Sequence, residues 1–438
     1  MADRHHRDED CAKLLRHLRR WGQLDRALHG AVGSAPMNRI GTSAHAAAGR
    51  TARADPRLVV LACGMFAIGT DSFVIAGILP RIAQDLDVDI GVAGQMITAY
   101  ALSYAIVTPI AAGLTSNIAR ERVLLVGLLI FVLGNLGTAF APDIFSVLLM
   151  RAVSGIGAAI FAPAASATAV ALTDPGRRGH ALAYMMVGLS SATAFGAPFG
   201  TVLSEFFDWR TVILLIACLG GIVALGVSVS IRNISLPKAI AMRDRIKPLA
   251  DAQVTGALLA TFLVLAGLYT VYSYISVVFH PATRGEGTAL ALLLSIWGLG
   301  AIVGSVAAGR LTDKYGSRAV VNVTLICLAI DIAALHWTGT IFAASAISIL
   351  IWGICGWGFT IPQQHRLTSI MPDHSQITLG FYATAVYLGA AASGVIGAVA
   401  LRFLDARSLP LVGAALIAAG FVVSEMAGYR SNEKSARP

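Results

Sequence analysis

The residues of this chain that could do chemistry are charged side chains set inside long apolar stretches. Arg151 lies in one such stretch, with Gly155 and Gly157 close behind it, and Asp71 lies in an earlier one. A guanidinium keeps its proton, so burying it in hydrocarbon costs about 3 kcal/mol or more unless water or a partner reaches it. Charges kept in such surroundings usually mark a path for ions or substrate. The two residues therefore predict a transporter.

The composition places these charges in a membrane protein. Of 438 residues, 56% are hydrophobic and 13% are charged, and the mean hydropathy is +0.72. A soluble domain carries about a quarter charged residues, so the bilayer must be the solvent for most of this chain. The net charge of +9 is not gathered on a soluble domain, and we expect no nucleic-acid partner.

Apolar stretches of about 20 residues, each long enough to cross a bilayer, recur between short polar breaks. We predict twelve transmembrane helices, near 58–80, 91–113, 122–141, 144–171, 180–203, 211–231, 254–279, 288–308, 319–337, 341–362, 377–400 and 409–428. The predicted fold class is an all-α membrane protein. Lysine and arginine number thirteen in one alternating set of connections and five in the other. This bias predicts that both termini are cytoplasmic.

A repeated loop divides the twelve helices into two halves. The copy after the second span contains Gly113, Asn117 and Arg120, and the copy after the eighth contains Gly309, Asp313, Lys314, Gly316 and Arg318. Matching positions lie 196 residues apart. We therefore predict six-helix bundles at 58–231 and 254–428 around a midplane site. A basic cytoplasmic linker at 232–253 joins them, and residues 429–438 form a cytoplasmic tail.

The first 57 residues differ from the rest because they are polar and rich in histidine and arginine. They lack the apolar core and cleavage site of a secretory signal. We interpret residues 1–57 as a disordered cytoplasmic tail; a basic amphipathic helix on the inner leaflet and a translation start at Met37 are alternatives. His5 and His6 are too isolated for a metal site.

The charged and glycine-rich motifs resemble those of the major facilitator superfamily. The loop after the eighth span matches the family's G-x-x-x-D-[RK]-x-G-x-R pattern, and the first copy is degraded, with Asn117 in place of the aspartate. Arg151, Gly155 and Gly157 are similar to the family's fourth-helix arginine motif. The fifth-helix glycine–proline motif of exporters is matched in a shortened form by Gly188, Gly196, Pro198 and Gly200. The resemblance covers residues 58 to 428.

Within that superfamily the chain is similar to twelve-span drug:proton antiporters, particularly the chloramphenicol and arabinose efflux branch. The shared markers are Gly69-Thr-Asp71-Ser-Phe73, Leu79-Pro80, Ala93-Gly94-Gln95, Tyr100-Ala-Leu and Trp209-Arg210. Many relatives carry a glutamate one position after Asp71, where this chain has Ser72. That shift turns the acid by about 100° around the helix.

The resemblance implies the major facilitator fold, two pseudo-symmetric six-helix bundles whose first and fourth helices adjoin a central cavity. Asp71 and Arg151 lie about 13 Å and 10 Å from the same side of the membrane, at 1.5 Å rise per residue. We expect the two side chains to meet or to share a water. Asp71 is then the candidate carrier of the coupling proton, paired with Arg151. The alternatives are a structural ion pair that fixes two helices and a polar residue that snorkels to the interface.

The same resemblance assigns roles to the other motifs. Asp313, Lys314 and Arg318 are expected to pair across the cytoplasmic ends of neighbouring helices, and the loop residues of both copies are expected to act in gating. The fifth-helix residues are expected to give a smooth face for close packing. Candidate cavity residues are Tyr100, Tyr104, Phe161, Tyr269, Tyr272, Trp352, Trp357 and Gln363, joined by Tyr274 and Gln364. Such surfaces suit flat, moderately lipophilic molecules, although aromatic belts at the membrane interface give similar patterns.

The function expected from these residues is secondary export of a small organic compound by proton antiport in the bacterial inner membrane. We expect a monomer that binds substrate, protons and lipid, without cofactor or metal. Sugar efflux and proton-coupled import are alternatives. An enzyme is not expected because no clustered nucleophile, base or metal-ligand motif is present. Asp331 is expected to make an interhelical hydrogen bond or to lie on a path to outside water, with proton coupling as the alternative. The cysteines within the spans are expected to be small core residues.

Overall fold

The computed structural model describes residues 55–115, 117–174, 177–232, 234 and 247–435. The predicted tail at 1–57 lies outside these ranges except for its last three residues, and α3 already begins at Pro56. Residues 235–246 of the predicted linker and 436–438 of the predicted C-terminal tail also lie outside. All regular structure in the described ranges is helical.

The helices of the first half precede residue 231. They are α3 (Pro56–Asp85), α4 (Ile90–Ala93), α5 (Gln95–Leu114), α6 (Arg120–Phe140), α7 (Ile144–Ala171), α8 (Arg178–Ser191), the π-helical turn η2 (Ala192–Gly196), α9 (Ala197–Phe206) and α10 (Trp209–Ser230).

The helices of the second half follow residue 246. They are η3 (Lys247–Ala250), α12 (Ala252–Ser273), α13 (Ile275–Val278), α14 (His280–Thr283), α15 (Gly287–Tyr315), α16 (Ser317–Thr338), α17 (Phe342–Ile370), η4 (Pro372–His374), α18 (Ser375–Phe403), η5 (Ala406–Ser408) and α19 (Leu409–Ser435).

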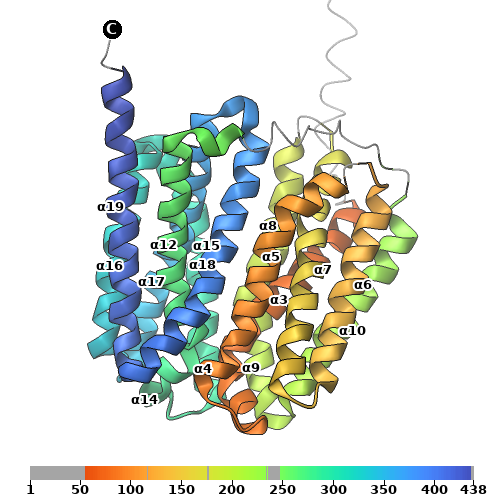
Figure 1. Ribbon diagram of the computed structural model, residues 1–438, viewed down its shortest axis with the longest axis vertical. Helices are drawn as coiled ribbons and strands as arrows, with labels where there is room; N and C mark the ends of the chain where they lie inside the picture. Colours follow the sequence, from red (N-terminus) through yellow and green to blue (C-terminus); the bar gives the residue numbers. More distant parts are fainter. Residues whose placement is uncertain (1–54, 116, 175–176, 233, 235–246, 436–438) are drawn as a thin grey trace, which may run out of the picture. The chain divides into compact units, whose positions relative to one another are not determined.

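Twelve segments of the described ranges are long and apolar enough to cross a bilayer, one for each predicted stretch. The fifth of them joins α8, η2 and α9 across Arg178–Phe206. The first-half helices form one six-helix bundle and the second-half helices form the other, as Figure 1 shows on its right and left sides. The predicted all-α fold class is confirmed.

Several spans begin at an aspartate that caps the helix. Asp55, Asp143, Asp208 and Asp251 each accept a hydrogen bond from a backbone N–H of the first turn of α3, α7, α10 and α12. Such a cap stabilises a helix by about 1 kcal/mol. At Asp143 the backbone N–H of Ser146, assisted by its hydroxyl, lowers the pKa of the carboxyl below its ordinary value. Polar residues at these positions thus fix where the apolar helices start.

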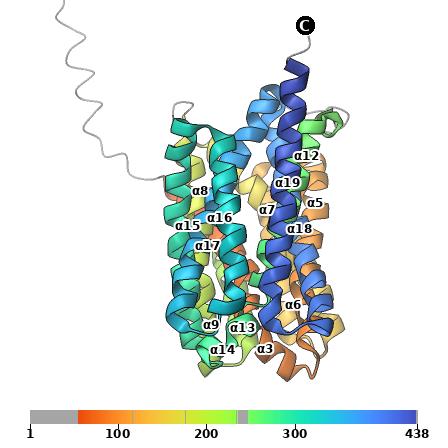
Figure 2. The same cartoon turned by 90° about the vertical axis from the view of Figure 1, so that its left-hand side faces the viewer.

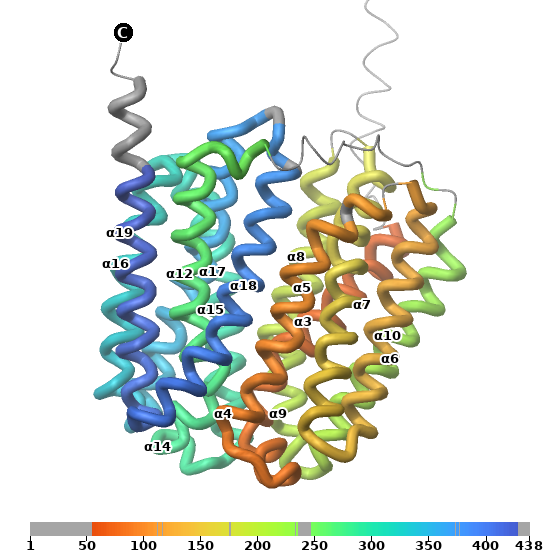
Figure 3. The backbone as a smooth tube through the Cα atoms, viewed as in Figure 1, coloured from red at the N-terminus to blue at the C-terminus, as the bar shows by residue number. Residues whose placement is uncertain are grey.

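The most extensive contacts between the bundles are those of α5 with α18 and of η2–α9 with α15. Thr98 Oγ1 donates to the Ala391 carbonyl at 3.0 Å, and Gln95 Nε2 donates to the Gly394 carbonyl at 3.2 Å. The end of the bundles at which α19 finishes is called the C-terminal end, and the one that holds α4 and α14 is called the opposite end (Figures 2 and 3). The α5–α18 hydrogen bonds come from the first turns of α5, toward the opposite end.

The expectation that the span cysteines are core residues was wrong for three of the four that the structure describes. Cys63, Cys218 and Cys327 are exposed, Cys355 is half-buried, and all four are free thiols. A thiol is as compatible with lipid as with a packed interior. Hydropathy alone therefore could not decide which face of a span each cysteine occupies.

Candidate functional site

Asp71 and Arg151 form an ion pair in the interior of the first bundle. Arg151 Nη1 donates to Asp71 Oδ1 at 2.6 Å, and Nη2 lies 3.4 Å from the Asp71 backbone oxygen. The side chains are 0% and 1% exposed, respectively. Asp71 Oδ2 and Arg151 Nε have no hydrogen-bond partner among the described residues. Each charge therefore depends on the other, because both side chains are shielded from bulk solvent.

Close helix packing brings Arg151 to this position. A Cβ on Gly155 would lie 2.4 Å from the backbone oxygen of Tyr100 on α5. A Cβ on Gly157 would lie 2.3 Å from the backbone nitrogen of Phe131 on α6. Only glycine permits these approaches, so the two glycines of the fourth-helix motif seat α7 against its neighbours. The arginine is thereby held beside α3 and α5.

The fifth-helix motif holds α3 from the other side. A side chain on any of its glycines would collide with α3, at 2.3 Å for Gly188 with Ala62, 2.1 Å for Gly196 with Thr70 and 2.4 Å for Gly200 with Val74. Pro198 is in the first turn of α9, directly after the π-helical turn η2. A proline lacks the N–H of a regular helix, and a π-turn accommodates it. The motif thus packs against the helix that carries Asp71.

Tyr100 of α5 covers the ion pair. The Arg151 guanidinium carbon lies 4.6 Å from the centroid of the Tyr100 ring, a cation–π contact. Ser72 Oγ donates to the Tyr100 hydroxyl at 3.1 Å. Tyr100 is therefore tied both to the arginine and to the residue next to Asp71.

A group of aromatic side chains in the second bundle contacts Phe73 on α3 of the first. We call these residues together the aromatic cluster; its members are Phe73, Tyr269, Tyr272, Trp297, Trp352 and Trp357. The centroid of Trp297 lies 4.8 Å from that of Tyr272 and 6.1 Å from that of Trp352. The Tyr272 hydroxyl donates to the Phe73 carbonyl at 3.1 Å, which links the second bundle to α3. Four of the predicted cavity residues thus come together two residues from Asp71.

Four other predicted cavity residues lie outside this cluster. Tyr100 and Tyr104 are on α5, and Tyr104 stacks on Tyr387 of α18 with ring centroids 3.5 Å apart. The Phe161 ring packs against Gly64 of α3 in the interior of the first bundle. Gln363 Nε2 donates to the Ala257 carbonyl at 2.8 Å and so ties α17 to α12.

Three residues of this region were not predicted as site residues. Trp297 lies ten residues into α15, and a mid-span tryptophan is unusual because the residue prefers the membrane interface. That position was a usable signal. Phe73 was a branch marker without a predicted contact role. Nothing in the spacing of Tyr387 distinguished it from a packing residue.

The second loop copy holds helices together at the C-terminal end. Gly316 directly follows the last residue of α15 and has φ of +82°, a conformation that favours glycine. Arg318 Nη2 donates to Glu425 Oε2 at 2.6 Å, and Asn322 Nδ2 donates to Glu425 Oε1 at 2.8 Å, so α16 is tied to α19. Lys314 Nζ lies 5.0 Å from the Tyr315 ring.

The remaining loop residues occupy the ends of neighbouring helices. Asp313 is exposed near the end of α15, and Gly309 lies one turn earlier in the same helix. In the first copy, Gly113 is in the last turn of α5, Asn117 is exposed and Arg120 begins α6.

A carboxylate connects the bundles at the opposite end. Glu205 Oε1 lies 2.7 Å from Arg81 Nη2 on α3 and accepts a hydrogen bond at 3.0 Å from the backbone N–H of Gly287, which starts α15. Asp85 pairs nearby with Arg210 and accepts from Trp209 Nε1 at 3.2 Å. Glu205 thus links the two bundles at this end, whereas the Asp85–Arg210 pair lies within the first bundle.

Asp331, the second acid within a span, has a neutral partner. Ser348 Oγ on α17 donates to Asp331 Oδ1 on α16 at 2.6 Å. The expected interhelical hydrogen bond of Asp331 is confirmed. No group of three metal-ligating side chains is found in the part of the chain that the structure describes.

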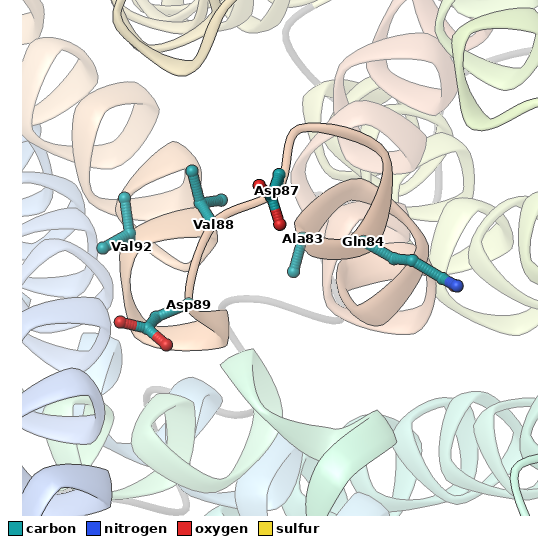
Figure 4. A pocket seen from close by; sticks show the side chains of 6 residues that line it. All are labelled: Ala83, Gln84, Asp87, Val88, Asp89 and Val92. Carbon is teal, nitrogen blue, oxygen red and sulfur yellow. The ribbon is translucent and has the colours of Figure 1, made fainter.

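A hollow of about 540 Å³ lies at the opposite end, between the end of α3 and the start of α4. Its lining comprises Ala83, Gln84, Asp87, Val88, Asp89 and Val92, and Figure 4 shows the two carboxylates at its edge. Asp87 has φ of +51°, which turns the chain between the helices. None of these residues belongs to the ion pair or the aromatic cluster, so the hollow is a separate surface feature.

Residues 61–394 match the Major Facilitator Superfamily. The inner membrane transport protein YdhP of Escherichia coli (strain K12) is 29% identical over 380 residues, which are 86% of this chain and 97% of that protein. A probable sugar efflux transporter of Mannheimia succiniciproducens is 24% identical over 84% of this chain and 92% of its own length. Among solved structures, a mutant of the nucleoside transporter NupG has a TM-score of 0.70 at 13% identity, covering 85% of this chain and 99% of that one.

Proposed function

The chain belongs to the Major Facilitator Superfamily, and from that premise we propose that it exports small, moderately lipophilic organic compounds in exchange for protons. Its twelve apolar helices and its likeness to an inner membrane transport protein make it a multi-pass transporter of the bacterial inner membrane. In this proposal Asp71 carries the coupling proton and Arg151 responds to its charge. The observation that carries the proposal is the fully buried pair of these residues.

Protonation of Asp71 would remove the counter-charge of Arg151. The neutral acid no longer balances Arg151, and an arginine left unpaired in the interior is unfavourable by about 3–5 kcal/mol. A conformation in which water reaches the arginine is then favoured. Because a proton and a conformation are linked in this way, the pair can couple proton movement to alternating access.

The aromatic cluster is the proposed substrate surface. Phe73 is two residues after Asp71 and its ring centroid lies 5.6 Å from that of Tyr272 and 5.8 Å from that of Trp297. A flat molecule held by these rings would therefore lie beside the helix turn that carries the carboxylate. Rings of this kind favour aromatic and lipophilic compounds, which supports the drug:proton antiporter branch.

Sugar efflux is the second candidate. Its support is the likeness to a probable sugar efflux transporter over 84% of this chain. A sugar would need hydrogen bonds as well as ring contacts, and the hydroxyls of the cluster are few. The two candidates differ in which compounds compete for transport.

We propose that the C-terminal end faces the cytoplasm. Arg120, Arg310 and Arg366 lie on that side, and the alternating set of connections to which they belong carries thirteen lysines and arginines in the sequence against five in the other set, in agreement with the positive-inside rule. The loop residues on that side would then gate the cytoplasmic opening, and the Arg318–Glu425 pair would hold α16 against α19 within the second bundle. With both termini inside, the Glu205 contacts lie on the outer side.

Transport in reconstituted vesicles tests the proposal. The probes are chloramphenicol, ethidium and arabinose, each measured with and without an uncoupler, in the unaltered protein and in Asp71→Asn. Asp331→Asn is the matched control, since it removes the other intramembrane acid. We expect Asp71→Asn alone to lose substrate-driven proton movement. Full proton movement in Asp71→Asn, or transport that survives the uncoupler, would contradict the proposal.

A further inference from the structure

We infer that Tyr387 is a positioning residue that transmits the state of the Asp71–Arg151 pair to the contact between the bundles. The inference rests on the proposed function, in which Asp71 binds the coupling proton. Tyr387 is on α18 of the second bundle, and the ion pair is wholly within the first. Tyr387 would therefore act on the pair through other side chains.

A continuous series of side chains connects the Asp71–Arg151 pair to Tyr387. The Arg151 guanidinium lies over Tyr100, with 4.6 Å to the ring centroid. The rings of Tyr100 and Tyr104 are 6.5 Å apart between centroids, and Tyr104 stacks on Tyr387 at 3.5 Å with an angle of 17° between the planes. Residues four apart on one helix face the same side, so Tyr100 and Tyr104 follow each other toward α18.

The stack is unlike the rest of the α5–α18 contact. Elsewhere these helices meet through small side chains, among them Ala101 with Ala390 and Ala391, and through the hydrogen bonds from Gln95 and Thr98. Alanines that touch can slide past one another with little change in packing. Two stacked rings lose their contact when either helix shifts by a ring's width, since close-packed interiors change in discrete steps. Among the α5–α18 contacts, the Tyr104–Tyr387 stack is therefore the one that changes most when either helix shifts.

A change in the charge of Asp71 can displace this series of side chains. While Asp71 is charged, its Oδ1 holds one guanidinium nitrogen of Arg151 at 2.6 Å. Once Asp71 is neutral, the ring of Tyr100 becomes the stronger remaining attraction for the cation. Tyr100 is also held by Ser72, the neighbour of Asp71. A displacement of Arg151 and α3 is thus passed to Tyr100, and through α5 to the stack.

The transmission can be measured without a known substrate. Spin labels are placed at Leu114→Cys and Ala252→Cys, exposed positions at the C-terminal ends of the two bundles, after the five native cysteines are replaced. Double electron–electron resonance then gives the distance distribution in lipid nanodiscs. Asp71→Asn serves as the mimic of the protonated acid.

The inference predicts which backgrounds respond to that mimic. Asp71→Asn should shift the distance distribution in the unaltered protein, in Tyr387→Phe, which keeps the stack, and in Thr98→Val, which removes another α5–α18 contact. In Tyr387→Ala the shift should fall at least about twofold, since one aromatic stack changes an equilibrium about two- to tenfold. Tyr104→Ala, which removes the stack from the other side, should behave like Tyr387→Ala.

The outcomes distinguish a failure of the role of Tyr387 from a failure of the proposed function. An undiminished shift in both alanine variants would overturn the role of Tyr387 and leave the proposed function standing. No shift with Asp71→Asn in any background would overturn both, because the acid would then not control the bundles. A shift lost equally in Thr98→Val would also overturn the inference, since any loosening of the interface would have the same effect.

Discussion

The two bundles each bury one acid, and the partner of that acid differs. In the first bundle Asp71 faces Arg151 at 2.6 Å; in the second, Asp331 accepts a hydrogen bond from the Ser348 hydroxyl, also at 2.6 Å. A hydroxyl is neutral whether or not the acid carries a proton, whereas an arginine loses its counter-charge when the acid is neutralised. We therefore expect the protonation of Asp71 to change the conformation, and we expect Asp331 to hold α16 to α17 in either protonation state.

The two loop copies show a similar asymmetry at the C-terminal end. The second copy keeps Asp313 and Lys314 and contributes Arg318 to an ion pair with Glu425. The first has Asn117 where the second has Asp313, and Asn117 is exposed. The bundles thus share a framework, while the buried ion pair is in the first and the fuller loop motif is in the second.

The largest effect is expected from Arg151→Met. It leaves Asp71 buried without its cation, which should reduce the free energy of unfolding by about 3–5 kcal/mol and abolish transport. Thermal unfolding in detergent measures the loss. Adding Asp71→Asn should restore most of the stability without restoring proton coupling, and a double variant as unstable as Arg151→Met would contradict the pairing.

A smaller loss is expected where the fifth span packs against α3. Gly196→Ala places a Cβ 2.1 Å from Thr70 Oγ1, and such overpacking costs about 1–3 kcal/mol. Gly221→Ala on α10 is the matched control, because a Cβ there meets nothing within 4 Å. The unfolding midpoint of Gly196→Ala should therefore lie clearly below that of Gly221→Ala. Equal midpoints would mean that the close approach of α3 and the fifth span has no energetic role.

A still smaller loss of stability is expected at Asp331, the buried acid of the second bundle. Ser348→Ala removes the donor to Asp331 and should lower stability by about 1 kcal/mol, with proton coupling in vesicles unchanged. Loss of coupling in this variant would remove the contrast between the two acids.

The smallest effect is expected at the Arg318–Glu425 pair at the C-terminal end. Glu425→Gln weakens the contacts with Arg318 and Asn322 and should change stability by less than about 1 kcal/mol. If the pair gates the cytoplasmic opening, the transport rate should change more than the unfolding midpoint does. A rate and a midpoint both equal to those of the unaltered protein would exclude a gating role.

Much of this architecture could be predicted from the sequence because lipid imposes a simple rule. Each span needs about 20 apolar residues, so the sequence predicts the twelve transmembrane helices and their order. The depths of Asp71 and Arg151 followed from helical rise, and their meeting depended on knowing which helices adjoin in the resembled fold.

Helix rotation could not be predicted in the same way. An apolar side chain is accepted both by lipid and by the packed interior, so hydropathy did not show that Cys63 is exposed or that Phe161 packs inside the first bundle. Nor did it show that Gln363 would bond to the Ala257 carbonyl. Trp297 and Tyr387 acquire their importance only from partners far away in sequence.

Infrared difference spectroscopy between acid and alkaline pH tests the central claim most directly, because it detects the C=O stretch of a protonated carboxyl group without any substrate. The purified protein is compared in lipid with its Asp71→Asn and Asp331→Asn variants. We predict that a carboxyl band appearing on acidification is lost in Asp71→Asn and kept in Asp331→Asn. A band that persists in Asp71→Asn and vanishes in Asp331→Asn would contradict the account.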